Sequence, residues 1–156
     1  MEAQSARERV WRYALLILWM AFIAFASSRE FSAENTSKII RPLLLWFFPN
    51  ISEERIAFVH FLTRKAAHFT EFAVLGWLSA RAFTVSSRQL LRRWWFFAGM
   101  LLVVLWALLD EFHQSFVPSR TASLYDSLID IAGGLTALIG YAYALGHYDS
   151  GEETDQ

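Results

Sequence analysis

Four segments of this 156-residue chain approach the length and apolar character of a membrane-spanning helix. Such a helix needs about 20 mostly apolar residues, because the hydrocarbon layer of a bilayer is about 30 Å thick. The segments are residues 10–26, 66–83, 90–109 and 124–146. Hydrophobic residues make up 55% of the chain, which is too apolar for an ordinary soluble domain of this size. We therefore predict a single all-α domain over residues 1–156, a polytopic membrane protein with four transmembrane helices.

Two parts of the chain allow more than one interpretation. The first apolar segment ends in AFASS, where Ala24 and Ala26 fit the small-residue pattern of a signal-peptidase site. The segment is long for a signal core, so a retained span is favoured over cleavage. Residues 36–50 (TSKIIRPLLLWFFPN) are apolar but too short to cross a bilayer, and they contain Arg41 and Pro42. They are typical of a segment that lies at the interface or re-enters the membrane partway.

The charge and cysteine content exclude several kinds of site. The chain has 14 basic and 15 acidic residues and so lacks the basic excess of a typical nucleic-acid-binding protein. It has no cysteine, which excludes a disulfide framework and a thiolate metal site. Residues 147–156 form a polar, acidic tail that we expect to be disordered. No motif identifies a cofactor, and the oligomeric state is left open.

The distribution of Lys and Arg favours an orientation with both termini in the cytoplasm. Basic residues beside transmembrane helices concentrate in short cytoplasmic loops. Seven basic residues would lie outside, but most of these are spread along the long first link. The seven that would lie inside are packed into two short segments: Arg7, Arg9 and Arg12, then Arg81, Arg88, Arg92 and Arg93.

Polar residues collect at segment ends that lie on one side of the membrane. Because spans alternate in direction, the start of the second segment, the end of the third and the start of the fourth share a side, the outer one in the favoured orientation. Ionisable side chains at membrane depth are costly unless they are paired or hydrated, and they mark candidate functional sites. The residues at these three ends are Lys65, His68 and Glu71, then Asp110, Glu111, His113 and Gln114, then Arg120, Asp126 and Asp130.

A polar stripe leads into the second segment. Its members are spaced four, four and three residues apart and so share one helix face: His60, Arg64, His68 and Glu71. A single histidine of this kind often only fixes the packing of helices through a hydrogen bond. A whole stripe indicates a hydrated cavity or a paired network. Asn50 and Glu53 have the spacing of a capping box, which predicts that this helix begins at the end of the first link.

Asp110 and Glu111 end the third segment with two anions. Anions at a helix C-terminus oppose the macrodipole, so helix stability does not account for them. His113 and Gln114 follow Asp110 at three and four residues and are expected on its face, whereas Glu111 is expected to point elsewhere.

The start of the fourth segment has structural interpretations of its own. Ser123 and Asp126 have the spacing of a capping box, so Asp126 has a structural as well as a functional interpretation. Asp130 lies one turn deeper on the same face, where it needs a cationic partner or protonation. Small residues in the same segment predict close approach of a neighbouring helix: Gly133, Gly134 and Gly140.

Acids, histidines and an arginine that converge from three helices suit two kinds of chemistry. Nitrogen and oxygen donors of this type can hold a divalent cation, although no motif of known metal geometry is present. Arg120 suits a different ligand, the phosphate or carboxylate of a polar headgroup. The residues considered for the cation are His68, Glu71, Asp110 and His113.

Three stretches closely resemble the VanZ-like family of small bacterial membrane proteins. They are RKAAHFTEFAVLG (64–76), LLDEFHQSFVPSRTASLYD (108–126) and the following helix that contains two adjacent glycines, so the resemblance covers residues 64–140. Two positions depart from the family pattern: Ser119 stands where Gly is usual, and Asp130, where Asn is usual, adds a negative charge. The motif positions of the family fall on Lys65, His68, Glu71, Asp110, Glu111, His113, Gln114, Arg120 and Asp126.

The resemblance implies a four-helix protein of the bacterial cytoplasmic membrane. Some relatives confer low-level resistance to teicoplanin and related glycopeptides, but whether this chain is an enzyme is left open. A membrane-embedded enzyme acting on a cell-envelope lipid or wall precursor would use Glu71, Asp110, Glu111 and His113 as catalytic residues. A protein that binds an amphiphilic ligand or lipid headgroup would use Lys65, His68, Gln114, Arg120, Asp126 and Asp130. A structural membrane scaffold is the third hypothesis, and the lipid bilayer is a partner in all three.

Overall fold

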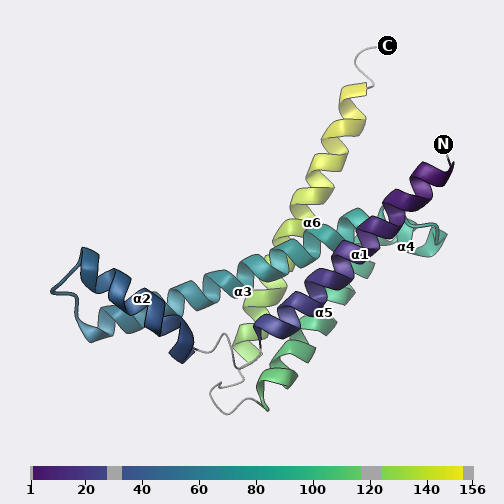
Figure 1. Ribbon diagram of the computed structural model, residues 1–156. Coiled ribbons are helices and arrows are strands. Elements are labelled where there is room, and N and C mark those ends of the chain that lie inside the picture. Colours follow the sequence, from purple (N-terminus) through teal and green to yellow (C-terminus); the bar gives the residue numbers. More distant parts are fainter. Residues whose placement is uncertain (1, 28–32, 117–123, 153–156) are drawn as a thin grey trace.

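The computed structural model describes residues 2–27, 33–116 and 124–152, which fold into six helices without a strand (Figure 1). The prediction of an all-α protein is confirmed for these residues. In chain order the helices are α1 (Glu2–Ala26), α2 (Ala33–Phe47), α3 (Glu53–Phe83), α4 (Gln89–Arg93), α5 (Trp95–Gln114) and α6 (Leu124–Glu152).

Three of these helices, not four, are long and apolar enough to span a membrane, so the predicted number was wrong by that criterion. They are the helices over Ala6–Ala26, Trp95–Gln114 and Tyr125–His147. The second expected span, residues 66–83, is part of the 31-residue α3. Its hydropathy is lowered by His68, Glu71 and Arg81, which interrupt the apolar sequence.

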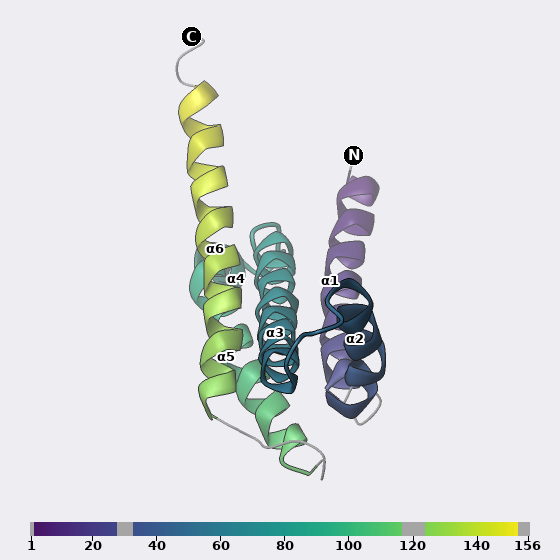
Figure 2. The ribbon, with the colours of Figure 1, turned by 90° about the vertical axis from the view of Figure 1, so that its left-hand side faces the viewer.

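Helix α3 is the centre of the fold, since α1, α2, α5 and α6 all pack against it (Figures 1 and 2). Helix α6 runs in the same general direction as α3 and crosses it (Figure 1): Lys65, near the middle of α3, pairs with Asp126 at the start of α6, and Thr84, directly after α3, approaches Tyr141 further along α6. Helix α1 runs antiparallel to α3. The Trp19 indole donates to the Glu71 carbonyl at 2.9 Å, and Arg12 donates to the Arg81 carbonyl at 3.2 Å.

Helix α5 is also antiparallel to α3 and packs against both α3 and α6. Gly99, early in α5, faces Ser79 and Leu138, whereas Gln114, at its end, reaches Arg64. The helix bundle therefore has two chemically different ends. The polar end contains Lys65, Gln114 and Asp126, and the basic end contains Arg12 and Arg81.

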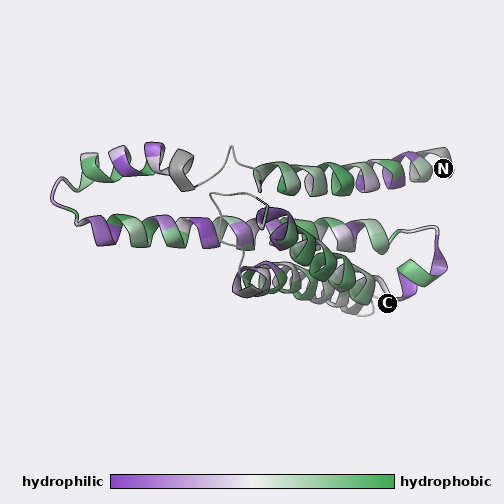
Figure 3. Cartoon of the chain, turned by 90° about the horizontal axis from the view of Figure 1, so that it is seen from below, coloured by the Kyte–Doolittle hydropathy of each residue, from purple (hydrophilic) through white to green (hydrophobic). Residues whose placement is uncertain are grey.

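The buried core is small and apolar, and much of the outer surface is apolar too (Figure 3). Phe72 and Leu75 of α3 pack with Val103 and Ala107 of α5 and with Ile23 of α1. Large apolar side chains remain exposed along the outside of the three apolar helices: Ile17, Leu18, Phe97, Leu101, Leu105, Leu128 and Ile139. An apolar exterior of this extent suits helices that face lipid.

Glycines bring the backbones of α3 and α6 into contact. A Cβ at Gly133 would lie 2.2 Å from the carbonyl oxygen of Phe69, and one at Gly76 would lie 2.4 Å from the carbonyl oxygen of Gly134. Such distances are too short for any side chain, so this crossing depends on glycine. The expected role of Gly133 and Gly134 agrees with this packing, but Gly140 has nothing within 4 Å of its Cβ position and takes no part.

Several expected boundaries are displaced. Helix α3 begins at Glu53 with Ser52 as its N-cap, whose hydroxyl accepts from the Arg55 amide at 3.4 Å, rather than at Asn50. Helix α5 covers Trp95–Gln114 instead of 90–109, so Asp110 lies inside the helix. The tail expected to be disordered is helical as far as Glu152, because extending an existing helix costs much less than starting one.

Helix α2 covers part of the segment expected at the membrane interface. It contains Pro42 and packs beside the first half of α3, where Arg41 and Glu53 form an exposed ion pair at 2.5 Å. Its second half and the residue after it expose large apolar side chains, Leu43, Trp46, Phe47 and Phe48.

Adding one methyl group at Gly133 should destabilise the α3–α6 contact. Gly133→Ala places a Cβ against the Phe69 backbone, which cannot move without separating the helices, and we expect a loss of about 1–3 kcal/mol. Gly140→Ala is the matched control, because it adds the same group in open space and improves helix propensity. Thermal unfolding of the purified protein in detergent should show a lower Tm for the first variant alone. Equal Tm values would show that the backbones are not in contact.

Candidate functional site

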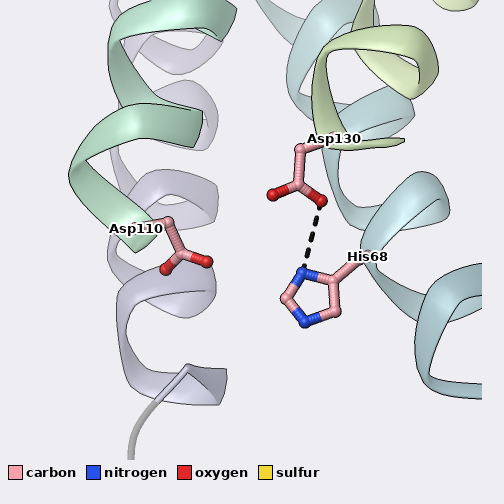
Figure 4. Close-up of side chains that lie close together, drawn as sticks. All are labelled: His68, Asp110 and Asp130. Atoms are coloured by element: carbon pink, nitrogen blue, oxygen red, sulfur yellow. Dashed lines mark ion pairs between the residues drawn. The ribbon is translucent and has the colours of Figure 1, made fainter. Parts of the chain in front are cut away.

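Three buried ionisable side chains meet at the polar end of the bundle, each from a different helix (Figure 4). His68 comes from α3, Asp110 from α5 and Asp130 from α6, and their exposed fractions are 7%, 4% and 0%. One donor atom from each lies within 4.8 Å of the others. The nitrogen Nδ1 of His68 is 3.3 Å from Oδ1 of Asp130. We call His68, Asp110 and Asp130 the buried triad.

The helix register explains why these three meet. On α3, His68 lies three and four residues from Lys65 and Arg64, so a single face of α3 carries all three. The glycine contacts between α3 and α6 follow closely and fix the register of the two helices, since Gly133 meets Phe69, the residue after His68, and Gly76 meets Gly134. Asp130 is thereby held opposite His68, and Asp126 opposite Lys65.

The carboxylate of Asp110 is held by Gln114, one turn later on α5. The amide nitrogen of Gln114 donates to Oδ2 of Asp110 at 2.7 Å and approaches the hydroxyl of Ser27, the residue after α1, at 3.5 Å. The amide oxygen of Gln114 accepts from Arg64 of α3 at 3.4 Å. Gln114 is 1% exposed, so a single buried amide connects three helices around the triad.

Lys65 and Asp126 close the network on its more accessible side. Their side chains form a direct ion pair between α3 and α6, with 21% and 11% of the side-chain surface exposed. The Lys65 ammonium also lies 5.2 Å from the centre of the Phe61 ring. Asp126 therefore has a specific cationic partner in Lys65. A role in capping the helix would not by itself explain this ion pair.

Asp130 is the least satisfied group of the network. Both of its carboxylate oxygens, and Nδ1 of His68, lack a hydrogen-bond partner among the described residues. The 3.3 Å separation between them exceeds the 2.7–2.9 Å or so of a charge-assisted hydrogen bond. A buried carboxylate without donors is unfavourable, so this position calls for a proton or a bound cation.

Two expectations about the face of α5 were wrong. Glu111 is buried, at 5% exposure, and His113 is exposed. The buried face of α5 also carries Val103, Ala107 and Gln114, so its centre lies between Asp110 and Glu111 rather than on Asp110. Each residue turns the helix by about 100°, which brings Glu111 in and leaves His113 out.

The four residues considered for a cation from the sequence are not the group that the fold assembles. His68 and Asp110 belong to it, His113 is exposed, and Glu71 is half-buried beside the α1 contact. Asp130 is the third member of the group that the fold assembles. Arg120, the expected partner of a headgroup, lies outside the described residues.

Sequence reasoning did not include Arg64 or Ser27 among the site residues. Arg64 lies on the polar stripe, so its spacing from His68 was a usable signal. Ser27 is buried at the end of α1, and only the tertiary fold brings it to Gln114.

Energetic coupling between Lys65 and Asp126 should be measurable. In a double-mutant cycle of Lys65→Ala and Asp126→Ala, unfolded by denaturant in detergent, we expect a coupling energy of about 1–3 kcal/mol, because the pair is largely buried. The matched control is Arg41 with Glu53, an exposed pair, for which we expect less than about 1 kcal/mol. Additive effects at Lys65 and Asp126 would contradict the ion pair.

Comparison with known proteins identifies the family of this chain. No curated protein and no solved structure matches the chain. A family model described as VanZ/LLP1 matches residues 10–145, which include all of α2, α3, α4 and α5, most of α1 and α6, and every residue of the network described above. Since this match covers most of the chain, the protein belongs to the VanZ/LLP1 family.

Proposed function

We propose that this VanZ-like membrane protein modulates susceptibility to teicoplanin-type glycopeptides by binding the polar head of an amphiphilic ligand at the polar end of the bundle. The observation that carries the proposal is the convergence of buried ionisable side chains from three helices on one end. Such groups are costly beside lipid and are retained there for function. The binding residues are Lys65, His68, Gln114, Arg120, Asp126 and Asp130.

The proposal places the polar end on the outer side of the cytoplasmic membrane and both termini in the cytoplasm. Support comes from the basic end, where Arg12 of α1 meets the end of α3 close to Arg88, Arg92 and Arg93 in the sequence. Helices α1 and α5 are both antiparallel to α3 and so point the same way. On this proposal the second half of α3, which packs against α1, α5 and α6, carries the chain back between them, although it falls short of the length and hydropathy of the three apolar helices.

An amphiphile suits the surroundings of the network better than a small soluble ligand. The outside of α5 and α6 is apolar near the polar end, where Phe112, Leu109 and Leu128 are exposed. A lipid tail can lie along this surface while its head reaches Lys65, which is partly accessible. Helix α2, with its exposed Trp46 and Phe47, fits the interface on the same side.

A second candidate function is catalysis on a cell-envelope lipid or wall precursor, with Glu71, Asp110, Glu111 and His113 as catalytic residues. The observation in its favour is that Asp110, one of these four, lies in the buried triad with His68, whose Nδ1 is 3.3 Å from Oδ1 of Asp130. A carboxylate placed in this way orients an imidazole so that its other nitrogen can exchange a proton.

Substitution of the acids at the polar end tests both functions. In a susceptible bacterial host that expresses the protein, we expect Asp110→Asn and Glu111→Gln to move the teicoplanin inhibitory concentration toward the vector value at unchanged membrane abundance. Glu54→Gln is the matched control, because it makes the same change at an exposed position of α3. A binding protein should lose only part of its effect on the inhibitory concentration, since the amide keeps the shape of the acid. An enzyme should lose at least about tenfold in its catalytic rate.

The proposal fails if the wild-type protein leaves susceptibility unchanged, or if both variants keep the full effect at normal abundance. Loss of abundance in every network variant, with no specific loss of effect, would instead favour a structural scaffold.

A further inference from the structure

We propose that the buried triad of His68, Asp110 and Asp130 is a binding site for a divalent transition-metal cation, with Zn²⁺ as the reference ion. The inference deepens the proposed function, since it assigns a ligand to the same polar end, but it is tested by cation binding alone.

The geometry of the triad is close to what a metal site requires. A tetrahedral Zn²⁺ with bonds of about 2.0–2.2 Å keeps its ligand atoms a little over 3 Å apart. The His68 and Asp130 donor atoms are 3.3 Å apart, and the Asp110 donor completes a group within 4.8 Å. In Figure 4 the imidazole of His68 and the carboxylates of Asp110 and Asp130 face a common space between three helices. A small inward movement of Asp110 would give three ligands.

Asp130 provides an independent reason to expect a cation. Its side chain has no exposed surface, and neither carboxylate oxygen has a hydrogen-bond donor among the described residues. The nitrogen Nδ1 of His68 is also without a hydrogen bond and faces Asp130. Polar atoms that are buried, aimed at one point and unsatisfied by the protein are the pattern that a bound ion satisfies.

The charges around the triad support a divalent ion. Asp110 and Asp130 together carry two negative charges when ionised, and His68 is a metal ligand in its neutral form. Two cations of the network, among the residues that the structure describes, are engaged with other groups, since Lys65 pairs with Asp126 and Arg64 donates to Gln114. One divalent cation would balance both carboxylates without the need to protonate either.

Gln114 acts as a positioning residue for the site. Its amide nitrogen holds Oδ2 of Asp110 at 2.7 Å, which leaves the other carboxylate oxygen for the cation. Outer hydrogen bonds of this kind orient the ligands of a metal and affect its affinity. Mixed imidazole and carboxylate donors favour Zn²⁺ or Mn²⁺ over Mg²⁺ and Ca²⁺, which prefer oxygen alone.

The cation also makes the pocket suitable for an anionic head. Without it, a phosphate or carboxylate would approach a group of buried acids and be repelled. Three protein ligands leave at least one coordination position of Zn²⁺ for an outside atom. An oxygen of the amphiphile that the proposed function requires can take this position.

The test is cation binding to the full-length protein in detergent, purified with a tag that contains no histidine. After removal of metal with a chelator, titration calorimetry with ZnCl₂ and elemental analysis after gel filtration should give one Zn²⁺ per chain. We expect His68→Gln, Asp110→Asn and Asp130→Asn each to weaken binding by about tenfold or more, and Gln114→Ala to weaken it by about tenfold. Glu54→Gln is the matched control and should bind like the wild type.

Circular dichroism and gel filtration identify variants that fold, and any one folded triad variant is enough for the comparison. Absence of stoichiometric Zn²⁺ in the wild type, or equal binding by a folded triad variant, overturns the inference. Such a result leaves the proposed function standing if the susceptibility effect persists. Conversely, triad variants that lose Zn²⁺ but keep the full susceptibility effect confirm the cation site and contradict the proposed function.

Discussion

The backbone contact between α3 and α6 is the constraint on which the rest of the structure depends. At Gly76, Gly133 and Gly134 the two helices approach more closely than any side chain would allow. Because the helices run in the same general direction and are fixed at this crossing, the polar residues that precede it on each helix face each other. Lys65 then meets Asp126 and His68 meets Asp130. The glycines thus carry no chemistry themselves but determine which charged groups become neighbours.

The cost of burying these groups explains their arrangement. An ionisable side chain in an apolar environment is tolerated when a partner of opposite charge or a set of hydrogen bonds compensates it. Most of the network follows this rule, through the Lys65–Asp126 pair and through the bonds of Gln114 to Asp110 and Arg64. Asp130 does not, and it is the most deeply buried acid. The unsatisfied carboxylate of Asp130 is the observation from which we propose a bound cation.

Much of this organisation could be predicted from the sequence, because it depends on helix periodicity and on apolar length. The four-residue spacing from Arg64 to His68 predicted the polar face of α3 that contributes to the network. The pair Gly133 and Gly134 predicted the close contact between helices. Rotation of α5 about its axis could not be predicted, since it depends on which neighbours Val103 and Ala107 meet. For that reason His113, rather than Glu111, was expected on the same face of α5 as Asp110. The position of Asp130 opposite His68 likewise required the register of α3 against α6, which the sequence does not contain.

The most direct test of the account is the side of the membrane on which the polar end lies. The absence of native cysteine makes labelling of single cysteines specific. Ser115 follows α5 at the polar end, and Ser87 lies in the turn at the basic end, and both are exposed. With a membrane-impermeant maleimide on intact cells, Ser115→Cys should be labelled and Ser87→Cys should react only after the membrane is permeabilised. Labelling of Ser87→Cys alone in intact cells would place the polar network in the cytoplasm and contradict the account.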